Sequence, residues 1–359
     1  MSASACLIVH PYTARKDIGA GHDRYAYELL NRLPSLGVTP TLFESGHLTT
    51  VSQALMAEVK AVARLACMRG KERVYHATAT VNAQSAITAR KHPLVTTIHD
   101  VLWFAVGAHY DSRIKYFLKT NAIRRAAARS DALIVPFAST RDFLVNELKT
   151  PAERIHIVPY GVDHDQFYGM RPEEDLPRPV FFPAGKVVLF VGAVNFGKGI
   201  DTLIQCFDRV VKSVPDAQLV VGSGGWDTPL LRPIWEKSSV KEHIRFVGFI
   251  PEGQLRSAYV HADLTAFPSR YGFGLATLES MACGTPTVSG RTLDAPEFIG
   301  DAGLMADPND AEELATQIIR GLVDGELRES LIRRGLGKSA AFRWQQMAVE
   351  TAAVYRTLL

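Results

Sequence analysis

The sequence predicts an α/β protein made of two doubly wound domains, each built on a parallel sheet. Short β-rich segments alternate with longer stretches of helical spacing, which is typical of βαβ units. The alternation restarts after a Pro- and acid-rich stretch, residues 171–183, which we interpret as the linker. We therefore expect an N-terminal domain over residues 1–170 and a C-terminal domain over residues 184–344, with the last helix, 345–359, packing back on the first domain. Ligands of such sheets bind at the carboxyl ends of the strands, so we expect a site in a cleft between the domains.

Each predicted domain is a series of β-rich segments separated by helical stretches. In the first domain these segments lie at residues 7–9, 41–43, 74–75, 94–98 and 133–135. In the second domain they lie at residues 187–191, 219–221, 244–247, 264–267 and 287–288. Tyr25, Leu29 and Leu33 share one face of a helical stretch, as expected of a crossover helix that covers a sheet.

The composition is that of an ordinary soluble protein. Of the 359 residues, 47% are hydrophobic and 21% are charged, which suits two domains of usual size. No apolar run approaches the roughly 20 residues that cross a bilayer, and the opening residues lack the basic start of a signal peptide, so we expect a cytoplasmic protein. The four cysteines form no CxxC pair, which predicts neither a disulfide framework nor a zinc site.

Basic residues are more frequent in the first half of the chain, although the net charge of the whole chain is only +3. The excess is too small to indicate nucleic acid binding, which needs a concentrated basic stripe. It favours an anionic partner, such as an acidic membrane face or a phosphorylated acceptor. Residues 113–129 contain Lys and Arg and no acidic residue, so they form either a peripheral membrane contact or a solvated helix face.

The most informative stretch is residues 264–290. An apolar strand at 264–267 ends in a glycine-flanked aromatic residue, and a short helix then runs to Gly284. A strand that ends in glycines before a helix exposes backbone N–H groups and the positive end of the helix dipole, which suits a phosphate. Glu279 lies about one turn into the helix, where a carboxylate can accept hydrogen bonds from vicinal hydroxyls. The stretch therefore predicts a ligand with both phosphate and sugar, and a nucleotide sugar has both.

The same stretch resembles the signature of the retaining glycosyltransferases of family 4, which have the GT-B fold of two Rossmann-like domains facing a central cleft. The residues that match in order are Pro268, Ser269, Tyr271, Gly272, Phe273, Gly274, Leu275, Leu278, Glu279, Met281, Ala282, Cys283, Gly284, Thr285 and Pro286. The signature has a first Glu eight residues before Glu279; Tyr271 holds that place here, so the first Glu is replaced or deleted. The resemblance implies a catalytic role for Glu279 and donor contacts from Tyr271, Gly272, Phe273, Gly274, Leu275 and Glu279.

A second glycine-containing loop, residues 192–199, follows the first strand of the second domain. It comes within one residue of a P-loop, but Gly199 stands where that pattern needs a hydroxyl for magnesium, which argues against an NTPase. The loop resembles the family's own V-G-R-x and R-K-G pattern, with Ala193 in place of the usual Arg. The resemblance implies that Gly192 and Lys198 bind the donor, and that Lys198 is the catalytic cation that neutralises its diphosphate.

Residues 245–251 resemble the segment whose backbone holds the nucleobase in this family. The resemblance implies that Phe249 and Ile250 lie beside the base. Backbone contacts discriminate poorly between bases, so uridine, guanosine and adenosine all remain open.

A glycine-bearing turn follows the first strand of the first domain. By itself such a feature is more often only a turn. The family has a glycine-rich loop at this place, which faces the cleft. The resemblance therefore implies acceptor contacts from Gly19, Gly21, His22 and Tyr25.

His99 closes the strand at 94–98, where a side chain points toward the ligand edge of an α/β sheet. An isolated histidine at this place is usually a satisfied residue under a loop. The T-x-H-D motif recurs in the family, and the resemblance implies that His99 is a catalytic residue near the donor sugar. Trp103 follows as a stacking surface for the acceptor, and Asp100 orients the histidine or caps the next turn.

Asp163, His164 and Asp165 form a DxD triplet, the metal signature of a different glycosyltransferase fold. We reject a metal site, because no other metal ligands gather around the triplet. Neither a metal nor a cofactor is expected.

Together these features predict a retaining transferase that moves a hexose from a nucleotide-diphosphate sugar to a hydroxyl of a glycan, a lipid-linked or a small-molecule acceptor, as in polysaccharide biosynthesis. In the family a cation and helix termini stabilise the leaving diphosphate, and one of its oxygens takes the proton of the incoming hydroxyl. The alternatives are a catalytically silent GT-B protein that binds a nucleotide or glycan, motivated by the missing Glu and Arg, and a sugar-phosphate epimerase.

Overall fold

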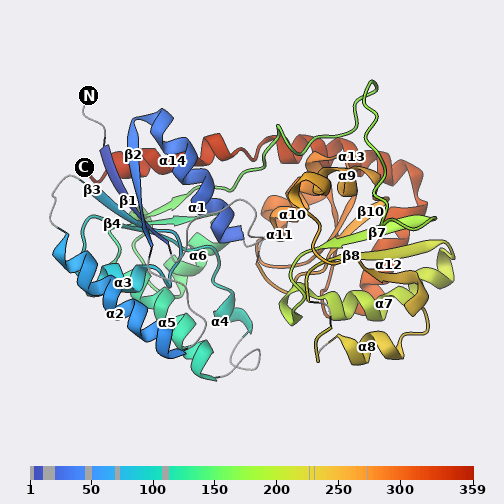
Figure 1. Cartoon of the computed structure of the whole chain (residues 1–359), viewed down its shortest axis with the longest axis horizontal. Helices are drawn as coiled ribbons and strands as arrows, with labels where there is room; N and C mark the ends of the chain where they lie inside the picture. The colour runs from blue at the N-terminus through green and yellow to red at the C-terminus, as the bar shows by residue number, and fades with distance from the viewer. Residues whose placement is uncertain are drawn as a thin grey trace. The chain divides into compact units, whose positions relative to one another are not determined.

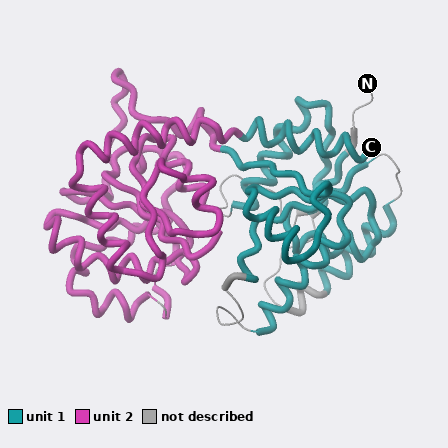
Figure 2. The backbone as a smooth tube through the Cα atoms, turned by 180° about the vertical axis from the view of Figure 1, so that it is seen from behind, with its two compact units in different colours: residues 1–161, 344–359 teal, residues 162–343 magenta. Residues whose placement is uncertain are grey.

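The computed structural model describes residues 4–10, 21–44, 51–68, 73–106, 113–225, 227–229, 231–272 and 274–359. The chain forms two compact units, which Figure 2 colours separately. Unit 1 is Met1–Gly161 together with Trp344–Leu359, and unit 2 is Val162–Arg343. The division comes before the expected boundary at residue 170, and the residues of the last helix belong to unit 1.

Unit 1 is a parallel six-stranded sheet with strand order β2-β1-β3-β4-β5-β6 (Figure 1). Its strands are β1 (Ser4–His10), β2 (Val38–Glu44), β3 (Arg73–Ala77), β4 (Leu94–Thr97), β5 (Ala132–Val135) and β6 (Ile155–Ile157). Its helices are α1 (Gly21–Arg32), α2 (Val51–Cys67), α3 (Ala83–Thr88), α4 (Leu102–Val106), α5 (Arg113–Arg129), α6 (Ala138–Asn146) and α14 (Trp344–Arg356), with the 3-10 helices η1 (Leu33–Leu36) and η2 (Ala152–Arg154).

Unit 2 is a second parallel six-stranded sheet, with strand order β12-β11-β10-β7-β8-β9. Its strands are β7 (Lys186–Val191), β8 (Ala217–Gly222), β9 (Ile244–Phe246), β10 (Leu264–Phe267), β11 (Thr287–Gly290) and β12 (Leu304–Ala306). Its helices are α7 (Ile200–Ser213), α8 (Arg232–Lys237), α9 (Glu252–His261), α10 (Leu275–Ala282), α11 (Ala295–Phe298), α12 (Ala311–Val323) and α13 (Gly325–Ala340), with η3 (Phe196–Lys198), η4 (Lys241–His243) and η5 (Gly300–Ala302).

The predicted fold class is confirmed. Every strand expected from the sequence is present, and each sheet has one strand more than expected, β6 and β12. Both extra strands are three residues long and lie at the edge of a sheet. Runs this short carry no readable alternation, so only pairing with a neighbouring strand identifies them.

The core of unit 2 shows why its helices form where they do. In α7, Leu203, Phe207 and Val210 recur at helical spacing and are fully buried. They belong to the same core cluster as Leu314 and Ile318 of α12, so the two amphipathic helices cover one face of the sheet together. The side chain of Asp310 caps the first turn of α12 by accepting from two backbone amides.

The stretch interpreted as a linker is fastened to unit 2. Glu174 accepts a hydrogen bond of 2.6 Å from Arg256 of α9, and Arg256 also donates to the carbonyl of Tyr168. Ser257 donates to the carbonyl of Pro177. Hydrogen bonding by Arg256 lowers the pKa of Glu174 to about 2. Residues 171–183 are therefore better described as a strap on unit 2 than as a free connection.

The last helix is joined to the sheet of unit 1 by a buried polar network. The ring of His76, on β3, lies 2.6 Å from the hydroxyl of Tyr355 on α14 and 2.7 Å from that of Thr97. Tyr25 of α1 hydrogen-bonds to the same Thr97 hydroxyl at 3.0 Å. Burial, and to a lesser degree the nearby His99, lowers the pKa of His76 to about 3, so its ring is neutral.

The basic helix α5 buries Thr120, Ile123 and Ala127 and leaves its first turns exposed. Ile114 is 73% exposed and Phe117 is 62% exposed. Among the helices that the structure describes, none has both the length and the apolar character needed to span a bilayer.

Candidate functional site

The switch point of the sheet in unit 2 lies between β7 and β10. The chain runs outward from β7 to β8 and β9, then returns to place β10 against the other side of β7. Since both strands are parallel, the loops that follow them, residues 192–199 and 268–274, leave the sheet at the same edge. Ligands of doubly wound sheets bind at such a point. These are the two loops for which the sequence predicted phosphate and sugar contacts.

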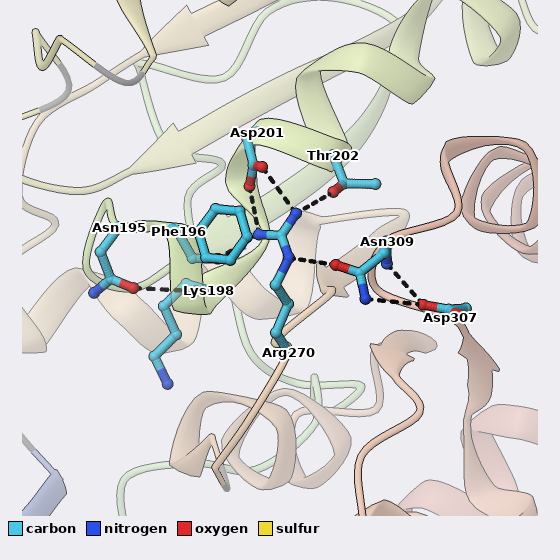
Figure 3. A network of polar contacts seen from close by, with 8 residues as sticks. All are labelled: Asn195, Phe196, Lys198, Asp201, Thr202, Arg270, Asp307 and Asn309. Carbon is cyan, nitrogen blue, oxygen red and sulfur yellow. Dashed lines mark hydrogen bonds and ion pairs between the residues drawn. The ribbon is translucent and has the colours of Figure 1, made fainter. Parts of the chain in front are cut away.

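Lys198 lies at the end of η3, in a loop with a fixed backbone. The side chain of Asn195 accepts a hydrogen bond of 3.1 Å from the amide of Lys198. Gly199 then takes a left-handed conformation, with φ of 67°, and starts α7. A side chain at this position would overlap with the carbonyl oxygen of Pro268, so glycine allows the two loops to approach closely. Figure 3 shows the ammonium of Lys198 directed away from the neighbouring polar network.

That network is centred on Arg270, a residue that no sequence motif indicates. Its guanidinium makes a bidentate ion pair with Asp201 at 2.7 and 2.8 Å and donates to Thr202 at 2.8 Å (Figure 3). It also donates to the side chain of Asn309 at 2.7 Å, and to the carbonyl of Phe196, whose ring it covers at 3.8 Å. Only 9% of the Arg270 side chain and 10% of the Asp201 side chain are exposed.

We call Arg270, Asp201, Thr202, Asn309 and Phe196 the Arg270 clasp. It joins the loops that follow β7, β10 and β12. Arg270 occupies a variable position of the signature, so the motif itself did not single it out. Asp201, in the first turn of the helix after Lys198, gives no separate signal, because the helix dipole by itself favours an acidic residue there.

Tyr271 stands where the signature has its first Glu. A side chain added at Gly197 would overlap with the hydroxyl and ring of Tyr271, so the tyrosine lies directly against the backbone of the Lys198 loop. The residue that replaces the expected carboxylate thus packs between the two loops and adds no negative charge to this edge.

The glycine run after β10 opens directly into α10. Gly272 has a φ of 72°, and Gly274 is the N-cap, which has no side chain to accept from the first amides of the helix. The amide of Thr277 bonds to the carbonyl of Gly274 at 2.9 Å. An N-terminus of this kind offers backbone donors and the positive end of the helix dipole to an anion. Phe273 lies outside the described residues.

Glu279 is a part-buried residue on the same helix. Its carboxylate accepts a hydrogen bond of 3.2 Å from the hydroxyl of Tyr259 on α9. Burial, with the negative charge of Glu279 beside it, raises the pKa of Tyr259 well above its ordinary value, so Tyr259 stays a donor. The contact holds one side of the carboxylate in place.

The residues predicted to lie beside a nucleobase differ in exposure. Ile250 is buried and packs against Gly222. A side chain at position 222 would overlap with the terminal carbons of Ile250. Phe249 is 60% exposed. Gly192, after β7, donates its amide to the carbonyl of Gly222 at 3.3 Å. Gly192 and Gly222 therefore meet at the carboxyl ends of β7 and β8, which places the predicted residues next to the switch point.

In unit 1, His99 has a protein partner at each ring nitrogen. Its Nε2 donates to the carbonyl of Thr78 at 2.6 Å, and its Nδ1 lies 2.6 Å from the hydroxyl of Tyr160. A carbonyl can only accept, so Nε2 carries a hydrogen, and in the neutral form of the ring Nδ1 then accepts from the hydroxyl of Tyr160. The ring also meets the edge of Tyr25 at 5.3 Å. Both ring nitrogens are thus hydrogen-bonded within the protein. This geometry agrees with the alternative interpretation of His99, a fully hydrogen-bonded histidine under a loop.

The predicted acceptor residues are spread over several environments. Tyr25 is 1% exposed, and burial raises its pKa to about 12, so it is a core residue and not an accessible contact. Gly21 and His22 are exposed at the start of α1, and His22 lies 3.7 Å from Asp23. Trp103 is part-buried, with the ammonium of Lys119 6.0 Å from its ring centre. Gly19 lies outside the described residues.

Within the described residues, no group of three His, Cys, Asp or Glu side chains is placed to hold a metal ion. The DxD triplet forms a turn, in which the Asp163 carboxylate accepts from the amide of Asp165. The ring of His164 bonds to the carbonyls of Ser339 and Phe342. The triplet therefore joins segments of unit 2.

Most of the chain matches two described protein families. Residues 173–337 match the family described as glycosyl transferases group 1, and residues 73–166 match glycosyltransferase family 4. O-antigen chain mannosyltransferase B of Escherichia coli is 29% identical over 270 residues, which are 74% of this chain and 70% of that protein. An uncharacterised glycosyltransferase of Methanocaldococcus jannaschii is 30% identical over 74% of this chain and 69% of its own length.

Solved structures show the same fold over the whole chain. A sucrose-phosphate synthase from Thermosynechococcus elongatus is 21% identical, with a TM-score of 0.83 over 99% of this chain and 98% of its own. The Anabaena protein HepE, in complex with UDP-glucose, is 16% identical, with a TM-score of 0.74 over 99% of this chain and all of its own. The chain belongs to the family 4-like glycosyltransferases, which have the GT-B fold.

Proposed function

We propose that this glycosyltransferase is a retaining hexosyltransferase that uses a nucleoside-diphosphate hexose as donor and needs no metal. The observation that carries the proposal is the switch point of unit 2, where the Lys198 loop and the glycine run before α10 leave neighbouring strands at one edge. The Arg270 clasp and the close approach of Gly199 to Pro268 hold these loops together. Positive charge and backbone donors thus stand where a diphosphate is expected.

In the proposed reaction, Lys198 and the first amides of α10 neutralise the leaving diphosphate. The bond between the anomeric carbon and the phosphate oxygen breaks, and a bond to the acceptor oxygen forms on the same face. The proton of the acceptor hydroxyl passes to an oxygen of the leaving diphosphate. Glu279, held by Tyr259, accepts hydrogen bonds from sugar hydroxyls and fixes the ring. His99 enters the proposal as a positioning residue, because protein groups already occupy both of its ring nitrogens.

The relatives support the donor class. The Escherichia coli relative is named a mannosyltransferase, and the HepE structure contains UDP-glucose. The proposal covers glycan, lipid-linked and small-molecule acceptors. Peripheral membrane contact through residues 113–129 stays a prediction, and it is supported by the exposure of Ile114 and Phe117 among basic neighbours.

The test is a panel of UDP-, GDP- and ADP-hexoses, each with and without acceptors. Release of nucleoside diphosphate is measured, and NMR gives the anomeric configuration of the product. Lys198→Ala should lower kcat/KM by about 10- to 150-fold, because charge-assisted hydrogen bonds contribute about 1.5–3 kcal/mol. The matched control is Lys212→Ala, which removes an exposed lysine of α7 that pairs with Asp208 and should leave kcat/KM unchanged.

A catalytically silent protein of the same fold is the second candidate, because Ala193 and Tyr271 replace the Arg and Glu of the family pattern. Nucleotide binding by calorimetry, without turnover of any donor in the panel, would establish that candidate. Product with an inverted anomeric centre would reject the retaining mechanism, and isomerisation of the donor sugar without acceptor would indicate an epimerase.

A further inference from the structure

Unit 1 has an arginine-lined cavity at the edge of the sheet where β4 and β5 begin. Its volume is about 720 Å³. The walls come from the end of α3, the turn after it and the last turns of α5. The polar side chains that line it belong to Thr88, Arg90, His92, Arg124, Arg125 and Arg129. We call this cavity the arginine pocket.

The arginine pocket concentrates positive charge that the protein only partly offsets. Four guanidinium groups line it and no carboxylate does. Two carboxylates interact with residues of the lining. Asp131 bonds to the ring of His92 at 2.8 Å and to the amide of Leu94, and Glu58 interacts electrostatically with Arg125. Four like charges in one cavity repel one another, so an anion that enters it is bound favourably.

Several of these guanidinium groups have donor capacity left for a ligand. In the described part of the chain, the side chains of Arg90 and Arg129 make no hydrogen bond or ion pair. Arg125 makes one long contact, of 3.5 Å, to the hydroxyl of Thr88. Arg124 stacks on the ring of Phe104 at 5.0 Å, which holds its plane and leaves the N–H groups of its edge available.

The dipole of α5 explains only part of this cluster. Cations in the last turn of a helix interact favourably with its negative end, and this accounts for Arg129. It does not account for Arg90, which lies in the turn after α3, or for Arg124, which lies more than a turn before the end of α5.

We propose that the arginine pocket binds a phosphate-bearing ligand. A guanidinium presents a planar fork of N–H donors that matches phosphate oxygens, and a cavity of this size takes a group as large as a diphosphate. The pocket lies at the amino ends of the strands, whereas His99 follows the carboxyl end of β4. A ligand in the pocket therefore leaves the carboxyl edge of the unit 1 sheet open, and the site is independent of the proposed transfer reaction.

The first experiment is titration with inorganic pyrophosphate at low salt, followed by calorimetry. It is done in a Lys198→Ala background, so that the donor loop does not contribute. Arg90→Gln with Arg129→Gln should weaken binding by about tenfold or more, because two charge-assisted contacts are removed. The matched control, Arg113→Gln with Lys115→Gln, removes two charges from the exposed start of the same helix and should weaken binding by less than about twofold.

The proposal is overturned if pyrophosphate does not bind, or if both double variants weaken binding equally, since equal loss reports only a general change of surface charge. Circular dichroism checks that both variants are folded. A negative result in the pyrophosphate titration does not change the outcome of the transfer assay, which uses the protein with Lys198 intact. The two proposals are therefore tested independently.

A second arm identifies the source of the phosphate. Co-sedimentation with phosphatidylcholine vesicles, with and without phosphatidylglycerol, is compared for the pocket variant and for Arg232→Gln with Arg333→Gln. This control removes two exposed charges of unit 2 and leaves residues 113–129 unchanged. Loss of vesicle binding in the pocket variant alone, with competition by pyrophosphate, assigns the pocket to lipid headgroups. Retained pyrophosphate binding without vesicle binding assigns it to a soluble phosphate compound.

Discussion

The two units have similar parallel sheets but hold the side chains near their carboxyl edges by different means. In unit 2, Arg270 is the centre of the Arg270 clasp. It makes a nearly buried ion pair with Asp201 and a hydrogen bond to Asn309, which follows β12. In unit 1, His76, Thr97, Tyr25 and Tyr355 form a neutral, fully buried hydrogen-bonded network. Unit 2, which we propose binds the diphosphate of the donor, thus has a fixed ion pair near the carboxyl ends of its strands, whereas unit 1 has neutral groups there.

The difference has a physical reason. An ion pair fixes loop geometry strongly, but each of its members depends on the other, because a buried charge without a partner is costly. A neutral network is less costly to bury, yet it fails when one of its members gains a proton. The two units should therefore respond differently to the loss of a charge and to acid.

The largest effect is expected from Arg270→Met, which leaves the carboxylate of Asp201 buried without a partner. Unit 2 should lose about 3–5 kcal/mol of unfolding free energy, measured by chemical denaturation. Arg209→Met is the matched control, because the Arg209–Glu312 pair is exposed and should contribute at most about 1 kcal/mol. Equal losses in the two variants would remove the distinction between the units.

Adding Asp201→Leu to Arg270→Met separates the effect of the Arg270 clasp on stability from its effect on the position of the Lys198 loop. The double variant has no unpaired buried charge, so most of the unfolding free energy should return. Its kcat/KM should stay below the wild-type value, because the side-chain contacts of Arg270 with Asp201, Thr202 and the Phe196 carbonyl are lost. The backbone bond from the amide of residue 270 to the carbonyl of Gly197 remains, but it does not fix the start of α7. Recovery of both quantities would show that the clasp is only structural.

The next largest effect is expected in acid, where protonation of His76 lowers the stability of unit 1. Its folded pKa is about 3, below the ordinary value of 6.5, so between these values the unfolded chain binds a proton that the folded protein does not. The unfolding free energy of unit 1 should fall by about 1.4 kcal/mol per pH unit as the pH drops from 6.5 toward 3. His76→Gln should be less stable at neutral pH and should show a shallower slope in thermal unfolding across this range. Parallel slopes would contradict the buried neutral histidine.

The smallest effect is expected at the strap of unit 2. The pKa of Glu174 is about 2 when folded, against an ordinary value of 4.5, because Arg256 stabilises the ionised form. The stabilisation is present above pH 4.5 and is lost as the pH falls toward 2. Glu174→Gln should therefore lower the melting temperature slightly at neutral pH, and the gap to the wild-type protein should close in acid. A gap that is constant with pH would assign the strap to packing alone.

Much of the fold was predictable because its signals are local. Periodicity locates ten of the twelve strands that the structure describes, and the glycines after β10 mark the start of α10. The site was predictable only in outline. Lys198 and Glu279 were found through motifs, whereas Arg270 was missed because its partners Asp201 and Asn309 lie 69 and 39 residues from it in the chain. Tyr25 was assigned to an acceptor surface, and the packed sheet of unit 1 buries it.

The sequence by itself determined the two α/β units, the family and the loops that carry Lys198 and Glu279, since each depends on the order of neighbouring residues. Only the tertiary structure decided which side chains share a buried charge, which histidine nitrogens are occupied and where four arginines line one cavity. These features depend on strand order and helix packing, which bring distant residues together and remove water from between them.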